Sequence, residues 1–267
     1  MSDLEVGSAL ELLLHGEIVV EGRLVDASNA TLFCEIGHGT MSGRCVYKPV
    51  AGERPLWDFP DGTLAGREVA AFAVSEATGW GIVPPTVLRE GPFGPGMVQL
   101  WIDTVDDDAG TLVDVMAPAA LPDTWLRVLD ALGSDGEPVV LGHADDERLR
   151  RMTVLDVVLN NADRKGGHVL VEPGGAVHGV DHGVSFHAEP KLRTVLWGWA
   201  GEPLTLTEVT VLEALRDDLL GALGTTLVEL VSRHEVLACR RRVDRLLHES
   251  RLPYPTEGWP AIPWPPF

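Results

Sequence analysis

The sequence has few cysteines and no long apolar run. Its three cysteines, Cys34, Cys45 and Cys239, are widely spaced and form no Cys-x-x-Cys pair. An odd number at such spacing argues against a disulfide framework or a zinc site, so we expect buried thiols in a reducing cytoplasm. Runs of about eighteen apolar residues are absent and the first residues are acidic. We therefore expect neither a membrane-spanning helix nor a secretory signal peptide.

Basic residues are also scarce. Lysine and arginine number 21 against 40 acidic residues, which gives a net charge of −19. A field of this sign repels the phosphates of nucleic acids and of anionic lipids, so we expect no nucleic-acid partner and no membrane insertion. The basic triplet 240–242 is then expected to be a solvated helix face and not a lipid-binding patch.

The 267 residues are 45% hydrophobic, which suffices for one large domain or for two lobes with a core. The first hundred residues have the pattern of short strands. β-Branched runs separated by turn-forming residues predict strands at residues 17–25, 31–37, 43–50, 84–90 and 96–103. One helix is expected among these strands, with Thr63 as its N-cap and Gly79 at its end.

The second half has a largely helical pattern. Apolar residues recur at helical spacing in three stretches, residues 146–161, 206–224 and 227–249. The only strand-like insert that we expect in this half is Val169–Val184. The tail contains prolines at six positions, which predict an extended segment that its tryptophans pack onto the surface.

These elements predict an α+β chain with a bilobal organisation. The strand-rich N-lobe covers residues 1–103, an acidic, turn-like connector covers residues 104–110, the helical C-lobe covers residues 111–251, and the proline- and tryptophan-rich tail covers residues 252–267.

Four charged residues occupy the positions that phosphoryl transfer would require on these elements. Lys48 ends the third strand, and Glu68 lies near the start of the N-lobe helix. Asp163 lies in the loop after a C-lobe helix, and Asp181 follows the run AVHGV. Phosphoryl transfer uses a lysine on the phosphates, a glutamate that orients it, and aspartates that position the acceptor and hold the metal.

The order and spacing of these residues resemble the protein-kinase-like fold, and specifically its phosphatidylinositol 3-/4-kinase branch. That branch has a D-R-H-x-x-N catalytic loop and a D-F-G metal motif, where this sequence has DRKGGH at 163–168 and DHG at 181–183. Over roughly residues 17–199 the chain resembles most a family of actinobacterial proteins described as phosphatidylinositol-kinase-like. The resemblance implies that ATP and a divalent metal ion, Mg²⁺ or Mn²⁺, bind between the two lobes.

The resemblance also implies a role for each matching residue. Lys48 corresponds to the phosphate-binding lysine, Glu68 to its ion-pair partner and Asp163 to the catalytic base. His168 stands where the family has a metal-binding asparagine, and Asp181 matches the metal-binding aspartate.

Further positions of the resemblance concern the nucleotide. Lys165 replaces the histidine of the family's catalytic loop and adds a charge within reach of the γ-phosphate. Backbone groups around Gln99, Trp101 and Ile102 would contact adenine. In place of a glycine-rich loop, Ser28 and Asn29 would contact the phosphates.

Several departures from the family pattern leave alternatives open. His168 offers nitrogen where Mg²⁺ prefers oxygen, so the metal is Mn²⁺, or His168 contacts a phosphate, or the chain binds nucleotide without catalysis. His182 replaces the phenylalanine of D-F-G. A zinc-hydrolase site built from Asp181 and the histidines at 168, 178, 182 and 187 is a further alternative. Strand-like neighbours place His178 and His182 about 13 Å apart, which disfavours that site.

The sequence therefore predicts an ATP-dependent phosphotransferase that acts on a hydroxyl group of a small molecule or a protein. We do not expect a phosphoinositide acceptor, because the basic surface that would hold its head group is missing. The alternative is a catalytically silent nucleotide-binding module. Polar residues are dense in 160–168, between a buried helix and a buried strand, and burying them without a ligand would be costly.

Overall fold

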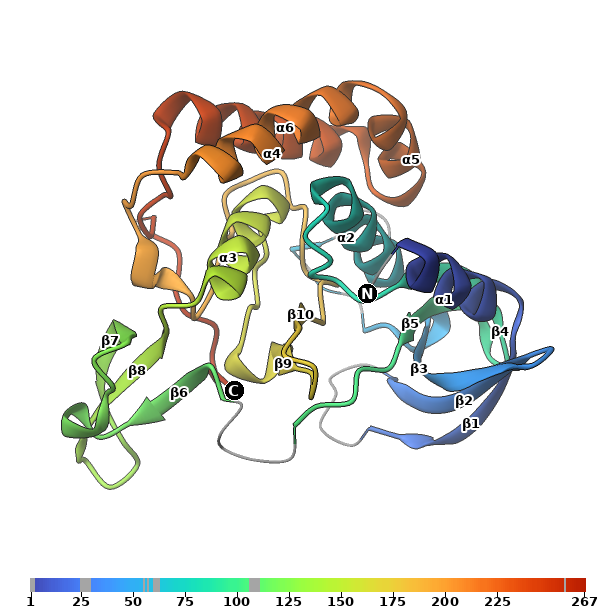
Figure 1. Cartoon of the computed structure of the whole chain (residues 1–267), viewed down its shortest axis with the longest axis horizontal. Coiled ribbons are helices and arrows are strands. Elements are labelled where there is room, and N and C mark those ends of the chain that lie inside the picture. Colours follow the sequence, from blue (N-terminus) through green and yellow to red (C-terminus); the bar gives the residue numbers. More distant parts are fainter. Residues whose placement is uncertain are drawn as a thin grey trace.

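The computed structural model describes residues 3–24, 30–54, 56, 58–59, 63–105, 111–256 and 258–267. A strand-rich half and a helix-rich half lie next to each other (Figure 1), which is the α+β, bilobal arrangement predicted from the sequence. Helices α4, α5 and α6 form a layer over α2 and α3, and the sheets lie on the opposite side.

The first half is built on a five-stranded antiparallel sheet with the order β1-β2-β3-β5-β4. Its strands are β1 (Glu17–Arg23), β2 (Leu32–His38), β3 (Met41–Pro49), β4 (Thr86–Gly91) and β5 (Gly94–Leu100). Alternate residues such as Ile36, Tyr47 and Val98 point to a common core. Cys34 and Cys45 face each other across β2 and β3, and both are buried free thiols.

Helix α1 (Asp3–His15) precedes the sheet. Its residues Leu12 and Leu13 are buried in the same core as the sheet residues. The expectation of a single helix in this half is therefore wrong. The stretch Leu10–Leu14 is only partly amphipathic by itself, and its helical state depends on the sheet surface that it covers.

Helix α2 (Leu64–Thr78) begins and ends where the sequence predicted. The Thr63 side chain accepts a hydrogen bond from the Gly66 N–H at 2.9 Å, and Gly79 ends the helix in the left-handed region with φ 67°. The apolar residues of α2 belong to a core that also contains residues of α3, α4 and α6. Helix α2 is therefore packed against the helical half as well as against the sheet.

The helices of the second half are α3 (Glu147–Leu159), α4 (Leu206–Leu220), α5 (Ala222–Leu230) and α6 (Arg233–Glu249). The two long helices expected at 206–224 and 227–249 are thus three. One break is at Gly221. At the second break Ser232 and Glu235 form a capping box that starts α6 anew. The capping box gives backbone N–H groups at the start of α6 side-chain partners in place of carbonyls of a preceding turn, so a new helix can begin here.

A three-stranded antiparallel sheet, with the order β6-β8-β7, lies in the second half. Its strands are β6 (Val113–Met116), β7 (Trp125–Leu132) and β8 (Pro138–Ala144). The expectation that Val169–Val184 contains the only strands of this half is therefore wrong. The expected insert is nevertheless present as a hairpin of β9 (Val169–Val171) and β10 (Val177–Gly179).

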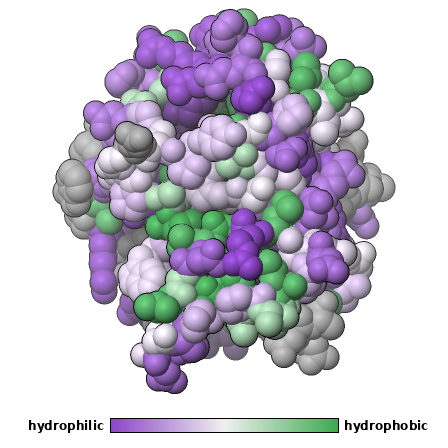
Figure 2. All heavy atoms as spheres, turned by 90° about the vertical axis from the view of Figure 1, so that its left-hand side faces the viewer, coloured by the Kyte–Doolittle hydropathy of each residue, from purple (hydrophilic) through white to green (hydrophobic). Residues whose placement is uncertain are grey.

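The β6-β8-β7 sheet escaped prediction because β7 has no clean alternation of apolar and polar residues. Its Leu129 and Leu132 are exposed, by 45% and 73%, although they are apolar. Figure 2 shows the face on that side of the molecule, where apolar side chains gather in the lower half. Short 3-10 turns complete the backbone at Val50–Gly52, Pro118–Ala120, Gly166–His168 and Trp197–Trp199.

The described part of the tail contains no helix and no strand. The Trp259 indole donates to the Lys191 carbonyl at 3.0 Å and packs as expected, whereas Trp264 is 87% exposed. The Pro266 carbonyl accepts from the Gly166 N–H at 2.8 Å, so the tail lies against the predicted catalytic loop. No helix among the described residues has the length and apolarity needed to cross a membrane.

Candidate active site

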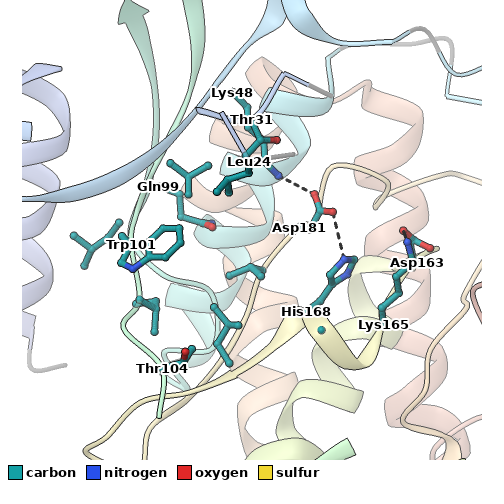
Figure 3. A pocket seen from close by; sticks show the side chains of 16 residues that line it. Leu24, Thr31, Lys48, Gln99, Trp101, Thr104, Asp163, Lys165, His168 and Asp181 are labelled. Carbon is teal, nitrogen blue, oxygen red and sulfur yellow. Dashed lines mark hydrogen bonds and ion pairs between the residues drawn. The ribbon is translucent and has the colours of Figure 1, made fainter. Parts of the chain in front are cut away.

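A cleft of about 580 Å³ lies between the five-stranded sheet and the loops that follow α3 and β10. Figure 3 shows side chains from both sides turned toward one another. The predicted residues that line this cleft are Lys48, Gln99, Trp101, Ile102, Asp163, Lys165, His168 and Asp181. Ser28 and Asn29, the predicted phosphate contacts, lie outside the described residues.

Lys48 is at the centre of the polar groups in the cleft. Its Nζ donates to Glu68 Oε1 at 2.7 Å and to Asp181 Oδ1 at 2.8 Å. The Glu68 side chain is 2% exposed, and its second oxygen accepts from the backbone N–H of His182 at 2.8 Å. Glu68 therefore connects β3 and α2 to the segment that contains Asp181.

The charges of this group depend on one another. Burial opposes the ammonium form of Lys48, but the carboxylates of Asp181 and Glu68 outweigh this and raise the pKa of Lys48. The Lys48 ammonium in turn holds the pKa of Asp181 well below its ordinary value. Both groups are thus charged at neutral pH.

Asp163 and Lys165 stand on the other side of the cleft. The Lys165 Nζ lies 3.2 Å from Asp163 Oδ2, and both side chains are partly exposed. The Asn161 side chain accepts from the Asp163 N–H at 3.0 Å and fixes the start of the loop. Burial raises the pKa of Asp163, although Lys165 opposes the rise. A raised pKa brings a carboxylate nearer to the range that suits a general base.

His168 lies between these two groups. Its Nε2 is 3.5 Å from Asp181 Oδ2, and Figure 3 shows the imidazole turned toward that carboxylate. Burial, together with the positive charges of Arg164, Lys165 and Lys48, lowers the pKa of His168 to about 4. The imidazole is therefore neutral at pH 7 and has a lone pair to offer.

The loop itself is held by a buried ion pair that the sequence did not predict. Arg164 and Asp156 are both fully buried, and Arg164 Nη2 lies 2.9 Å from Asp156 Oδ1. The same guanidinium donates to the His168 and Val180 carbonyls at 3.3 and 3.1 Å, and to His182 Nε2 at 2.6 Å. Arg164 thus ties α3 to both loops of the site.

Several polar side chains of residues 160–168 are satisfied within the protein. The Asn160 side chain donates to the His187 and Glu189 carbonyls at 2.8 and 2.7 Å, and the Asn161 side chain donates to Asp156 at 3.0 Å. Among the described residues the buried Nδ1 of His168 is left without a hydrogen-bond partner, so the expectation that this segment faces a ligand stays a prediction for His168. Asp163, Lys165 and His168 are the members of this segment that line the cleft.

The histidines do not form a zinc site. His182 is fully buried against Arg164, His178 lies 3.1 Å from Glu172, and His187 packs on the Phe59 ring. Among the described residues no three histidine, cysteine or carboxylate side chains are grouped as metal ligands. His182 replaces the apolar contact of a D-F-G phenylalanine with a polar contact to Arg164.

Fewer backbone N–H groups are free to bind adenine than the sequence predicted. The N–H groups of Leu100 and Trp101 donate to the carbonyls of Pro85 and Arg44 at 2.9 and 3.0 Å. Within the described chain no group accepts from the N–H of Ile102. Of these three N–H groups, that of Ile102 is therefore the one left for a ligand.

Gln99, also expected near adenine, is turned inward. Its side-chain amide donates to Thr86 Oγ1 at 2.8 Å, and the residue is only 4% exposed. The side chain is thus fixed by β4, and it limits the depth of the cleft.

A second cavity of about 450 Å³ adjoins the cleft. The two cavities share Lys48, Asp163, Lys165 and Asp181. The second cavity also has residues of α2, Arg193 and the exposed Trp264 in its wall. The shared side chains therefore stand at the junction of two spaces.

A mycobacterial protein is similar in sequence to nearly the whole chain. No protein-family model matches the chain. Protein Rv2133c of Mycobacterium tuberculosis is 52% identical over 264 residues, which cover 96% of this chain and 94% of that protein. The chain belongs to the family of Protein Rv2133c. This mycobacterial member agrees with the predicted actinobacterial family.

A second, weaker similarity does not define the family. The zinc-type alcohol dehydrogenase-like protein C16A3.02c of Schizosaccharomyces pombe is 26% identical over 153 residues, with 53% of this chain and 42% of that protein covered. The Rv2133c family member described here has no cluster of zinc ligands among its described residues.

The fold of this family is shown by a solved structure. The crystal structure of the Golgi casein kinase covers 93% of this chain and 75% of its own, with a TM-score of 0.51 and 13% sequence identity. At this identity the similarity concerns the fold alone. The bilobal, protein-kinase-like fold predicted from the sequence is confirmed.

Proposed function

We propose that the protein is an ATP-dependent phosphotransferase with ATP in the 580 Å³ cleft and a hydroxyl-bearing acceptor in the adjoining cavity. The observation that supports this most is the position of Lys48, Asp163 and Asp181 at the junction of the two cavities. A phosphoryl group passing from one space to the other has to cross this junction. The kinase-like fold agrees with the proposal but does not name the acceptor.

Each residue at the junction would have one task. Lys48, oriented by Glu68, would bind phosphate oxygens, and the Ile102 N–H would bind adenine. Asp163 would accept the proton of the acceptor hydroxyl while the new P–O bond forms and the bond to the ADP oxygen breaks. Lys165 would place a positive charge beside the transferred group.

We propose that Asp181 and His168 would hold a divalent metal ion. Asp181 supplies a charged oxygen, and neutral His168 supplies a nitrogen on the same side of the cleft. A bound ion would neutralise phosphate charge. Nitrogen is a softer ligand than oxygen and favours Mn²⁺ over Mg²⁺ at such a site.

The place of this chain within kinase-like proteins is also a proposal. The motifs DRKGGH and DHG, at 163–168 and 181–183, support the phosphatidylinositol 3-/4-kinase branch. The acidic net charge supports an acceptor other than a phosphoinositide.

We also propose a cytoplasmic location, because the thiols at 34, 45 and 239 are free. The lobe boundaries at about 103 and 111 stay predictions.

A catalytically silent nucleotide-binding module is the second candidate. Two observations favour it: His168 stands in place of the family's asparagine, and Lys48 is already paired with Asp181. Turnover in the presence of Mg²⁺ or Mn²⁺ separates the candidates, and the decisive variant is argued in the Discussion.

Replacing Lys48 by alanine will weaken ATP binding by about 10- to 100-fold, because a charged hydrogen bond contributes roughly 1.5–3 kcal/mol. Isothermal titration with ATP and Mn²⁺ measures the change. The variant leaves buried Glu68 without its cation, so Lys48→Met combined with Glu68→Gln serves as a charge-balanced second variant. Unchanged ATP affinity in both folded variants would contradict the role of Lys48.

Replacing His168 by asparagine restores the family pattern and will shift the metal preference toward Mg²⁺. The measurement is the ratio of ATP affinities with Mn²⁺ and with Mg²⁺, compared with a His248→Asn control on the exposed end of α6. A ratio that moves equally in both variants, or in neither, would show that His168 is not a metal ligand.

A further inference from the structure

A cavity of about 230 Å³ lies behind the catalytic loop, on the surface of α6. We call it the arginine cavity, after Arg241, Arg242, Arg245 and Arg251, which all line it. Its other walls come from the end of α3 and from segments 188–192 and 251–256. It shares no lining residue with the cleft or with the acceptor cavity.

The charge of this cavity is opposite to that of the whole chain. Four guanidinium groups surround it, and Glu249 is the one carboxylate in its lining. The lining therefore carries an excess of positive charge, although the chain has a net charge of −19.

Arg242 is the clearest sign of a missing partner. Its Nε and Nη1 donate to the carbonyls of Val158 and His187 at 2.8 and 3.2 Å. Its Nη2 is buried and has no nitrogen or oxygen acceptor among the described residues, and the neutral Cys239 thiol is a side-chain neighbour of the guanidinium. Leaving a buried guanidinium without an anion is unfavourable.

Glu235, a buried carboxylate of the same helix, does not fill this role. Glu235 is engaged with Arg67 at 2.6 Å. Burial lowers the pKa of Arg242, although the neighbouring Cys239 thiol and the charge of Glu235 oppose the fall. The expectation that 240–242 is a solvated helix face is thus wrong for Arg242, which faces inward.

We propose that the arginine cavity binds a small phosphate ester. Several guanidinium groups around one space suit an anion with oxygens in several directions, because each guanidinium can donate two parallel hydrogen bonds. The volume is below the range of sites for larger ligands, which suits a phosphate group with a short organic part. Trp197 and Tyr254 in the lining give that organic part an apolar contact.

The cavity is linked to the proposed active site through the chain at Asn160. The Asn160 side chain lines it and donates to the His187 and Glu189 carbonyls. Asn160 lies three positions before Asp163 in the chain. A ligand here would contact Asn160, at the start of the segment that leads to Asp163.

The test uses pyrophosphate and glycerol phosphate as probes, titrated calorimetrically at constant ionic strength. Because the cleft can also bind phosphates, all measurements are made in the Lys48→Met and Glu68→Gln background. Arg241→Gln combined with Arg245→Gln changes two exposed residues of the cavity and will weaken binding at least about tenfold. The matched control, Arg233→Gln with Arg240→Gln, removes the same charge from the same helix outside the cavity and will change affinity less than about twofold.

A third variant moves the affinity in the opposite direction. Glu249→Gln removes the only carboxylate of the lining and will strengthen binding, a result that a merely structural role of the arginines would not give. No binding of either probe at millimolar concentration would overturn the proposal. Equal losses in the cavity variant and its control would also overturn it, because they would mean attraction to the general charge of α6.

Discussion

Replacing Asp163 by asparagine will lower turnover by about 10²- to 10⁴-fold and leave ATP affinity nearly unchanged. The range is that expected for loss of a general base. Asp163 lines both cavities, and in the proposed mechanism it acts on the acceptor hydroxyl, whereas Lys48 and Asp181 would hold phosphate and metal. A group that acts only in the transition state contributes little to binding in the ground state. ADP release with Mn²⁺, measured over a panel of hydroxyl acceptors and with water alone, is the readout.

The same variant has a pH signature. Because burial raises the pKa of Asp163, the rate of the parent protein will rise with pH through a value above 3.8, the ordinary value of the carboxyl. That rising limb will be absent in Asp163→Asn. Asp217→Asn, an exposed substitution on α4, is the matched control and will keep the limb.

Two results would decide against this role. Turnover that is unaffected by Asp163→Asn would remove Asp163 from the chemistry. A parent protein without ADP release in Mg²⁺ or Mn²⁺, but with intact ATP binding, would favour the silent nucleotide-binding module.

Replacing Asp156 by alanine will destabilise the protein by about 3–5 kcal/mol, since it leaves the Arg164 charge buried without a partner. For a chain of this size the melting temperature falls by roughly 2–4 °C per kcal/mol, and calorimetry measures the loss. The surface pair Arg127 and Asp130 provides the control: breaking it with Arg127→Gln will cost less than about 1 kcal/mol.

Replacing both partners separates stability from positioning. In Asp156→Leu with Arg164→Met no charge is left buried, so much of the lost stability will return. The hydrogen bonds from Arg164 to His168, Val180 and His182 will still be missing, and ATP affinity will stay reduced. Restored ATP affinity together with restored stability would show that the Arg164 contacts do not position the site.

Elements with strong local signals were predicted well. Thr63 and Gly79 mark the two ends of α2. They could be predicted because an N-cap hydroxyl and a left-handed glycine depend only on residues nearby in the sequence. Lys48 and Glu68 could be paired in advance, because a strand end and the adjacent helix of one lobe lie close in this fold. The structure adds their contact distance and the direct contact of Lys48 with Asp181.

Features that depend on distant partners were missed. Arg164 was recognised only as part of a polar cluster, since nothing local indicates that its partner is Asp156 within the preceding helix. Strand β7 is defined by its pairing with β8 and not by its own pattern. Arg242 was taken for a surface residue, because only the folded chain places it against the Val158 and His187 carbonyls.

The contact of Lys48 with Asp181 has a thermodynamic consequence. Asp181 has Lys48 as its lysine partner, while Lys48 has both Asp181 and Glu68 as its anions. A nucleotide that takes Lys48 leaves Asp181 without a cation, and a metal ion that takes Asp181 leaves Lys48 with Glu68 alone. When both ligands bind, the ion pair between Lys48 and Asp181 is replaced by two, one between Lys48 and a phosphate and one between Asp181 and the metal ion. Nucleotide and metal should therefore bind cooperatively, and by linkage each raises the affinity of the other by the same factor.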